Sequence, residues 1–448
     1  MQGKRLLIAL ALLVALGGAI WWSDRSEKNK ANQPDPKAPP KIIDIKRAEI
    51  AKIEIARAGG ETTVLEIPKE NEFKLTAPAV YAVDKEAAQS LLSAVSDVSS
   101  DKVVEEKPQN LDEFGLSSPR VTVTVHTKDG KSRKLKIGDD VPVGGGAFAA
   151  AEGDARVFLL GSYAKGNLDK TAADLRDKRL LRFVPETLAR VTLAGKGPAI
   201  EFFKKSEGEW SITAPKPMRA NNWAVEELVR KLGEAKLDPA LTPEQGKDLD
   251  KQFASSSPVA KVTISGGEGS QTLELRKNKE GKFYARSSMV DGAHLLTDDV
   301  GKSFEKGLDE YRNKKLFDFG FSEPTRIEYK DEKLTLVAAR SQDKWLRDGK
   351  TLDNVGVQSL IDKLRELSAV SWPEGALGAP QINLGVVSND GKRTEKVSLA
   401  KSGEKWRAQR DGEPGLYELE NSTVEDLRSA AAAVKEQEPP KPSTPAKK

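Results

Sequence analysis

The strongest constraint on the fold is an internal repeat that fills most of the chain. Residues 73–78, FKLTAP, return as residues 210–215, WSITAP, 137 positions later, and Trp345 begins a more divergent third version. A repeat of this length differs from a short-period solenoid, because each copy is long enough to bury a core of its own. The sequence therefore predicts three related domains in tandem.

Each copy continues with the pattern of an amphipathic helix, in which apolar residues recur at positions i, i+3, i+4 and i+7. Asp84, Asn222 and Asn354 precede these patterns and are predicted to cap the helices through their side chains. The apolar positions are Ala88, Leu91, Leu92 and Val95 in the first copy, Val225, Leu228, Val229 and Leu232 in the second, and Val357, Leu360, Ile361 and Leu364 in the third.

After the helix, a proline opens a stretch in which apolar and polar residues alternate, beginning at Pro119, Pro258 and Pro380. A period of two predicts half-buried strands, and turn sequences such as residues 128–130, KDG, predict hairpins between them. A closing helix is expected at the end of each copy. The predicted class is α+β: an N-terminal transmembrane helix followed by three tandem repeats, each with antiparallel sheet, an amphipathic helix and a closing helix.

The segment before the repeats is apolar and predicts a membrane anchor. After a short basic start, residues 1–5, which includes Lys4 and Arg5, residues 6–22 form an unbroken apolar run that ends in Trp21 and Trp22. As a helix the run would be about 26 Å long, close to the hydrocarbon thickness of a bilayer. The tryptophans and the two cations suit the interfaces, whereas the small residues at positions 15 and 17–19 also fit a cleaved signal peptide.

The predicted domain boundaries follow from these patterns. Residues 23–41 form a proline-rich linker, the three repeats cover residues 42–183, 184–319 and 320–437, and residues 438–448 form a disordered tail rich in proline and lysine. Cations beyond the anchor would favour a body inside the cell. We nevertheless predict a single-pass protein of the inner or cytoplasmic membrane with a periplasmic body, because long domains translocate largely regardless of nearby charge.

Composition removes several classes of function. The 72 lysines and arginines nearly balance the 68 acidic residues, so no strong field attracts nucleic acid. The chain has no cysteine and only two histidines, which removes thiolate chemistry and most zinc sites. We expect no catalytic residue, no cofactor and no bound metal. The glycines 144–146 lack the sequence context of a phosphate-binding loop and predict a hairpin tip.

One recurring basic cluster remains as a candidate site. Such cations suit the C-terminal end of a helix, although they would also contact anionic headgroups or an anionic partner. The residues are Arg176, Lys178 and Arg179 in the first copy and Arg312, Lys314 and Lys315 in the second.

Together the basic start, the apolar run, the Thr-Ala-Pro strand, the DEFGL turn at residues 112–116 and the DKRLL segment at residues 177–181 resemble a known family. The chain is similar to bacterial membrane-anchored proteins grouped as domain of unknown function 4340. The motifs fade along the chain, because the third copy keeps only GALG at residues 375–378 in place of DEFGL. Members resemble accessory components of ABC-type transport systems of the gliding-motility kind. The resemblance implies permease or extracytoplasmic protein partners and transfers no functional residue.

The sequence thus favours a non-enzymatic envelope protein that acts as an interaction or accessory module of a membrane complex. Two alternatives stay open. The chain could be an extracytoplasmic binding module for cell-wall glycan or an anionic ligand, with tryptophans and basic residues as contacts. It could also be an envelope hydrolase that uses two carboxylates across a cleft, although no such pair is evident.

Overall fold

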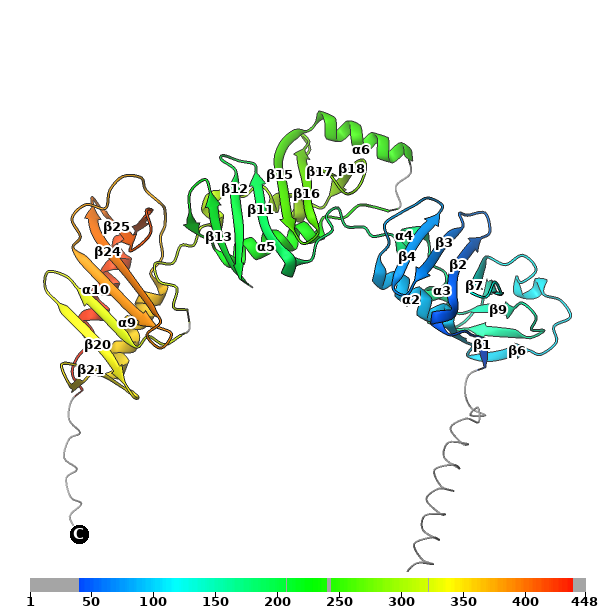
Figure 1. The fold of residues 1–448 in the computed structure, drawn as a ribbon, viewed down its shortest axis with the longest axis horizontal. Coiled ribbons are helices and arrows are strands. Elements are labelled where there is room, and N and C mark those ends of the chain that lie inside the picture. Colours follow the sequence, from blue (N-terminus) through cyan, green and yellow to red (C-terminus); the bar gives the residue numbers. More distant parts are fainter. Residues whose placement is uncertain (1–39, 207, 240–242, 321, 438–448) are drawn as a thin grey trace, which may run out of the picture. The chain divides into compact units, whose positions relative to one another are not determined.

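A computed structural model describes residues 40–206, 208–239, 243–320 and 322–437. The predicted anchor, most of the linker and the tail lie outside these residues. The chain divides between Lys178 and Arg179 into two compact units, and each is described by itself. The first unit holds one eight-stranded antiparallel sheet and a two-stranded sheet, and the second unit holds two eight-stranded antiparallel sheets (Figure 1).

The first unit is built on a sheet with the strand order β4-β3-β2-β7-β8-β9-β10-β6, and β1 pairs with β5 beside it. Its strands alternate as expected, because Val121, Val123 and Val125 are buried on the face where helix α2 also buries Leu91. The strands are β1 (Lys41–Asp44), β2 (Ile50–Arg57), β3 (Thr63–Lys69), β4 (Glu72–Ala77), β5 (Asp97–Ser99), β6 (Lys102–Glu105), β7 (Val121–Thr127), β8 (Ser132–Asp140), β9 (Ala147–Ala151) and β10 (Val157–Leu160). The helices are η1 (Arg47–Glu49), α2 (Lys85–Ser96), η2 (Asp112–Phe114), α3 (Ser162–Leu168) and α4 (Ala172–Leu175).

The second unit begins with a sheet of the order β14-β13-β12-β11-β15-β16-β17-β18. One face packs on α5, α7 and α8, while α6 lies against β17 and β18 and buries Phe253 beside Tyr284 (Figure 1). The strands are β11 (Leu188–Ala194), β12 (Ile200–Ser206), β13 (Glu209–Ala214), β14 (Met218–Arg219), β15 (Ser257–Gly266), β16 (Gly269–Lys277), β17 (Phe283–Ser287) and β18 (Ala293–Leu296). The helices are η3 (Pro185–Thr187), α5 (Asn222–Glu234), α6 (Pro243–Ser255), α7 (Asp298–Ser303) and α8 (Leu308–Tyr311).

The last sheet has the order β22-β21-β20-β19-β23-β24-β25-β26, and α9 and α10 lie side by side on one face of it (Figure 1). Trp406 is buried in this core, and its ring nitrogen donates to Asn421 Oδ1 at 3.0 Å. The strands are β19 (Arg326–Lys330), β20 (Thr335–Ser341), β21 (Lys344–Arg347), β22 (Lys350–Thr351), β23 (Ile382–Ser388), β24 (Arg393–Ser402), β25 (Lys405–Arg410) and β26 (Leu416–Leu419). The helices are α9 (Asn354–Glu366) and α10 (Asn421–Ala433).

The described part is mostly sheet with few helices, which confirms the repeated antiparallel sheets and their amphipathic helices. Two of the three predicted caps are one residue too late. Asn221 and Asp353 cap α5 and α9, with Asp353 Oδ2 accepting from the Gly356 backbone at 2.9 Å. Asn222 is already the first residue of the helix and does not cap it. Its Oδ1 instead accepts from the backbone N–H of Trp210 at 2.9 Å.

The segment after each closing helix packs into the domain that follows. Leu180 is fully buried in the second core, and its backbone N–H donates to Ala235 O at 2.9 Å. Leu316 is buried in the third core in the same way and donates to Leu367 O at 2.9 Å. The boundaries expected after residues 183 and 319 placed these segments in the preceding repeat. Their apolar side chains fill the next core instead.

Candidate functional site

The predicted membrane contacts cannot be placed in the structure. Lys4, Arg5, Trp21 and Trp22 lie outside the described residues. None of the described helices combines the length and the apolar character that a membrane crossing requires. The anchor therefore stays a prediction from the sequence.

The recurring basic residues lie just after two short helices, one in each unit. Arg176 and Arg312 follow the four-residue helices α4 and α8, and the lysines and Arg179 lie on the extended backbone beyond them. These cations therefore do not lie at the C-terminal end of a long helix. The guanidinium of Arg176 lies 4.5 Å from the ring centre of Tyr81, and that of Arg312 lies 4.1 Å from Trp372. Burial lowers the pKa of Arg312. These two cations are thus already used in cation–π contacts.

Glycines 144–146 and the histidine His126 form only local structure and contacts within the first domain. Glycines 144–146 form a turn between β8 and β9, as predicted. His126 Nε2 lies 3.3 Å from Glu54 Oε2 on the neighbouring strand. Among the described residues, no group of three or more histidines and carboxylates is placed to hold a metal ion.

A partly buried charge cluster lies in the second unit, where β14 of the second sheet meets the β25–β26 connection of the third. We call it the Arg219 network. It contains three guanidinium groups, three carboxylates and one phenol: Arg219, Arg393, Arg410, Asp318, Glu395, Glu413 and Tyr417.

Arg219 is the centre of this network. Its Nη1 pairs with Asp318 Oδ2, its Nη2 donates to Tyr417 Oη at 3.0 Å, and its Nε lies 2.7 Å from Glu413 Oε1. That last contact is an ion pair and not a hydrogen bond. The side chain of Arg219 is 19 % exposed, so the ion pairs are shielded from most of the solvent.

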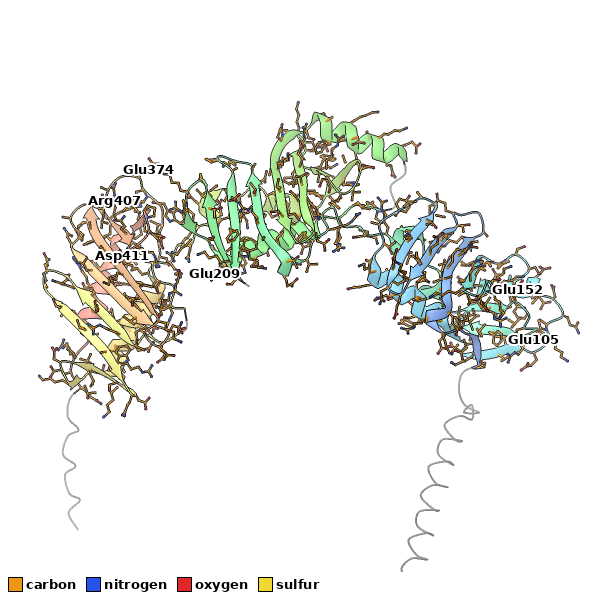
Figure 2. All side chains as sticks on the ribbon, in the orientation of Figure 1. Glu105, Glu152, Glu209, Glu374, Arg407 and Asp411 are labelled. Atoms are coloured by element: carbon orange, nitrogen blue, oxygen red, sulfur yellow. The ribbon has the colours of Figure 1, made fainter. Side chains whose placement is uncertain are left out.

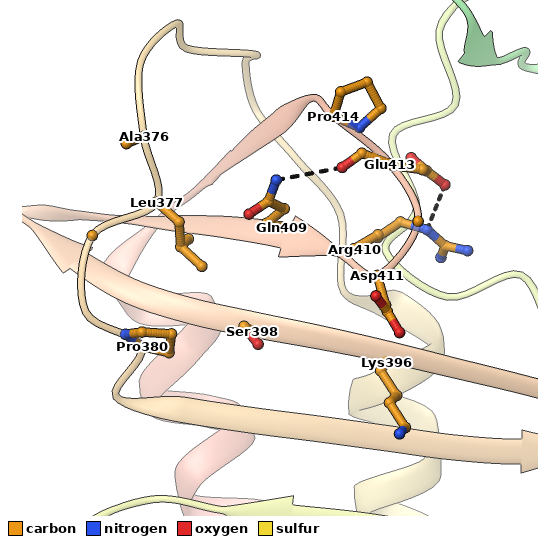
Figure 3. Close-up of a pocket in the computed structure, with 12 residues that line it drawn as sticks. Ala376, Leu377, Pro380, Lys396, Ser398, Gln409, Arg410, Asp411, Glu413 and Pro414 are labelled. Atoms are coloured by element: carbon orange, nitrogen blue, oxygen red, sulfur yellow. Dashed lines mark hydrogen bonds and ion pairs between the residues drawn. The ribbon is translucent and has the colours of Figure 1, made fainter.

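A second arginine extends the network into the third sheet. Arg410 Nη2 lies 3.1 Å from Glu395 Oε1. Its Nε lies 2.7 Å from Glu413 Oε1 (Figure 3). Glu395 Oε1 also accepts from the backbone N–H of Asp318 at 3.0 Å, and Tyr417 donates to Glu413 Oε2 at 2.6 Å. The segment between the second and third sheets, which contains Asp318, is therefore hydrogen-bonded directly to the third sheet.

The charged groups of the network shift one another's pKa values. Burial opposes charge on Arg219, but Tyr417, Asp318 and Glu413 outweigh it and raise its pKa above the usual value. Burial would raise the pKa of Asp318, yet the Arg219 guanidinium lowers it overall. Burial raises the pKa of Tyr417. Three cations face three anions, so the charges are compensated within the network, which joins two domains.

This network was not predicted, although the repeat contains a signal for it. Arg219 stands 137 positions after Ala82, and Asp318 stands 136 positions after Arg182, so an apolar and a basic residue became a pair of opposite charge. A charge change at two equivalent positions indicates a contact that the first copy does not make. Glu413 has no such signal, because it lies on the irregular connection between β25 and β26.

An open groove lies beside the network on the outer face of the third sheet, with a volume of about 820 Å³. The loop at residues 376–380 forms one wall, and Leu377 lies over the sheet (Figure 3). Lys396, Ser398, Gln409 and Asp411 form the floor and the opposite side. Its size falls within the range of ligand sites, roughly 300–1,000 Å³.

Comparison with known proteins identifies the family of the chain but no individual relative. A sequence model described as Domain of unknown function (DUF4340) matches residues 74–210 and again residues 210–384, which together exceed half of the chain. No curated protein and no solved structure matches the chain.

Proposed function

Because the chain belongs to this family, whose description assigns no activity, we propose its function from its own sequence and structure. It is a non-enzymatic, membrane-anchored envelope protein. It acts as an interaction or accessory module of a membrane complex, namely an ABC-type transport system, and its body is extracytoplasmic. The membrane location is supported by the apolar run at residues 6–22 and the proline-rich linker that follows it.

The observation that carries the proposal is the Arg219 network. Buried ion pairs contribute little net stability compared with apolar packing, and their best attested role is to specify one arrangement. Here the network joins Arg219 of the second sheet to Glu413 of the third, which favours a defined surface built from two domains. Such a surface suits a protein that binds other proteins. The transport partner is supported by the family resemblance described above.

The test is co-purification of the full chain from detergent-extracted membranes. We expect ABC-type permease subunits to be recovered with it, and recovery of the chain alone would contradict the proposal. Arg219→Ala should reduce the recovery of partner. Arg190→Ala is the matched control, because Arg190 makes an exposed ion pair with Glu201 at 2.6 Å in the same domain.

Binding to cell-wall glycan is the second candidate, and one observation favours it. Trp223, at the start of α5, is 73 % exposed, as in aromatic platforms that stack on sugars. Trp210, Trp345 and Trp406 are buried and Trp372 is covered by Arg312, so they offer no such platform. Sedimentation of the chain with purified cell wall, abolished by Trp223→Ala, would favour this function over the first.

A further inference from the structure

A further groove of the third domain lies on the face of the sheet that carries α9, between this helix and the hairpin of β20 and β21 (Figure 1). Its volume is about 780 Å³. The hairpin contributes Asp343 and Trp345 to its lining, and the helix contributes Val355, Gln358 and Glu366. The groove therefore combines one aromatic side chain with polar and charged ones.

Trp345 presents an unused hydrogen-bond donor to this groove. Only 7 % of this residue is exposed, and in the part of the chain that the structure describes its indole N–H has no acceptor. The indole N–H of a buried tryptophan usually has a hydrogen-bond partner. The donor of Trp345 is therefore available to an occupant of the groove.

The second domain shows the direction in which this donor points. Figure 2 labels Glu209, the residue just before Trp210 at the start of β13, and Trp210 is the counterpart of Trp345. Its Nε1 donates to Glu226 Oε1 on α5 at 2.5 Å. Counted from the helix caps, Gln358 is the counterpart of Glu226. Gln358 lines the groove, but its side-chain amide donates to a carboxylate of α9 at 3.0 Å. The third domain thus lacks the acceptor that the second domain supplies.

The groove also carries an excess of negative charge. Four carboxylates and two cations line it. The cations, Arg340 and Lys363, each pair with a carboxylate already. Of the carboxylates, Asp343 and Glu366 make no ion pair with any described residue. An occupant that brings both positive charge and a hydrogen-bond acceptor suits this lining.

The C-terminal tail starts two strands away from Trp345. The backbone N–H of Gln437 donates to Thr351 O at 2.8 Å, and that of Leu352 donates to Trp345 O at 2.8 Å. Two strand spacings are roughly 10 Å. Residues 438–448, EPPKPSTPAKK, span roughly 36 Å when fully extended. The tail is therefore long enough to reach the groove of its own domain.

The tail cannot make the contact that joins the earlier domains. Leu180 and Leu316 enter the next core and each donates a backbone N–H there. Leu316 lies four residues after Arg312, which forms a bridge with the preceding sheet, and Glu436 forms the equivalent bridge in the third domain. Four residues after Glu436 the chain has Pro440, which carries no N–H. The tail is thus left for a different contact.

The composition of the tail matches the groove. Pro439 and Pro442 have the spacing of segments that favour polyproline II and bind in aromatic-lined grooves. The carbonyl groups of this conformation have no internal partner and are free to accept. Three lysines stand against one glutamate. The linker at residues 23–41 has a similar composition, but it leads into the first unit, whereas the tail leaves the domain that holds the groove.

We propose that residues 438–448 bind in this groove of their own domain as an extended proline-rich segment. The indole N–H of Trp345 donates to a backbone carbonyl of the tail, and lysines of the tail pair with Asp343 and Glu366. A proline ring packs on Val355, which is 77 % exposed. This contact within the chain goes beyond the proposed function and does not depend on it.

The test follows the motion of the tail in the full chain in detergent. The chain has no cysteine, so Ser443→Cys allows a single nitroxide label on the tail. Electron paramagnetic resonance should show an immobilised component. Trp345→Phe keeps a ring, as Phe73 does in the first copy, and should raise the ratio of free to bound tail about fivefold, as expected for one hydrogen bond. Trp210→Phe is the matched control, because its N–H is used within the second domain.

A second pair of variants tests the charges. Asp343→Lys combined with Glu366→Lys should raise the same ratio roughly tenfold, because two attractive contacts become repulsive. Glu332→Lys combined with Glu404→Lys makes the same change of charge at two exposed positions of the third domain that do not line the groove. Circular dichroism of each variant checks its folding.

A label that moves freely in the chain with no groove substitution would overturn the proposal. So would an immobilised label whose motion changes no more in the groove variants than in their controls, since the tail would then be held elsewhere. An immobilised component that grows with protein concentration would identify the tail of a second copy as the occupant and would also overturn it.

Discussion

Removing Arg219 tests whether the buried network joins the second and third domains. In Arg219→Ala, Asp318, Glu413 and the hydroxyl of Tyr417 lose the cation that compensates their burial. Breaking a buried ion pair from one side costs about 3–5 kcal/mol. The side chains of Asp318 and Glu413 are 24 % and 23 % exposed, so water compensates part of this loss. We therefore expect about 2–3 kcal/mol.

Differential scanning calorimetry of the full chain measures this cost. For domains of this size 1 kcal/mol shifts the melting temperature by about 2–4 °C, so the transition of the second unit should fall by roughly 4–12 °C. The transition of the first unit should stay where it is, because the network lies wholly in the second. Hydrogen exchange should also accelerate at the backbone N–H of Asp318, which donates to Glu395.

Two controls separate the network from a general effect of losing a charge. Arg190→Ala removes an arginine whose side chain is 46 % exposed and should cost under about 1 kcal/mol. Arg219→Met combined with Asp318→Asn removes the central pair together and should recover part of the loss, because fewer charges are left unpaired. A shift in Arg219→Ala no larger than that of Arg190→Ala would refute the reasoning.

Four further results are expected from the same structure. Leu316→Ala should lower the free energy of unfolding of the second unit by about 2–5 kcal/mol in calorimetry, because Leu316 is fully buried in the third core. The pKa of Asp318 is lower in the folded state, so its stabilising contribution is present above about pH 4 and is lost as the pH falls through the folded value; acid denaturation followed by circular dichroism should be less steep in Asp318→Asn. Gly301→Ala should destabilise the second unit by about 1–3 kcal/mol in urea, because its new methyl would lie 2.1 Å from the ring of Phe283. Gly233→Ala meets open space in α5 and should instead stabilise it by up to about 1 kcal/mol.

The elements were predictable where one physical signal dominates. Leu91 and Leu228 lie at helical spacing and are buried on α2 and α5, and alternation in β7 places Val123 in the core. The α6 helix was not predicted from the sequence. It packs Phe253 against Tyr284 on the second sheet, whereas in the first domain Phe114 of the DEFGL turn packs against Phe148.

The candidate site was much less predictable than the fold. The basic residues Arg176 and Arg312 stand out in the sequence, yet each contacts an aromatic ring in its own unit. The residues that join the domains, Arg219 and Glu413, are 194 positions apart. Local patterns carry no information on such a pair, because it forms only when two complete domains meet.

The strand register settles a question that the repeat alone leaves open, namely where each domain begins. The family match runs from residue 74 to 210 and then from 210 to 384, so each match joins the second half of one sheet to the first strands of the next. Hydrogen bonding requires a different frame. The two halves of each sheet are joined by pairs of strands within one domain, β2 with β7, β11 with β15 and β19 with β23. A domain cut at residue 74 or 210 would leave these central strands as open edges, which is costly for a sheet whose faces are both partly covered. The repeat therefore gives the spacing between copies, whereas the pairing of the central strands fixes where each domain begins and ends.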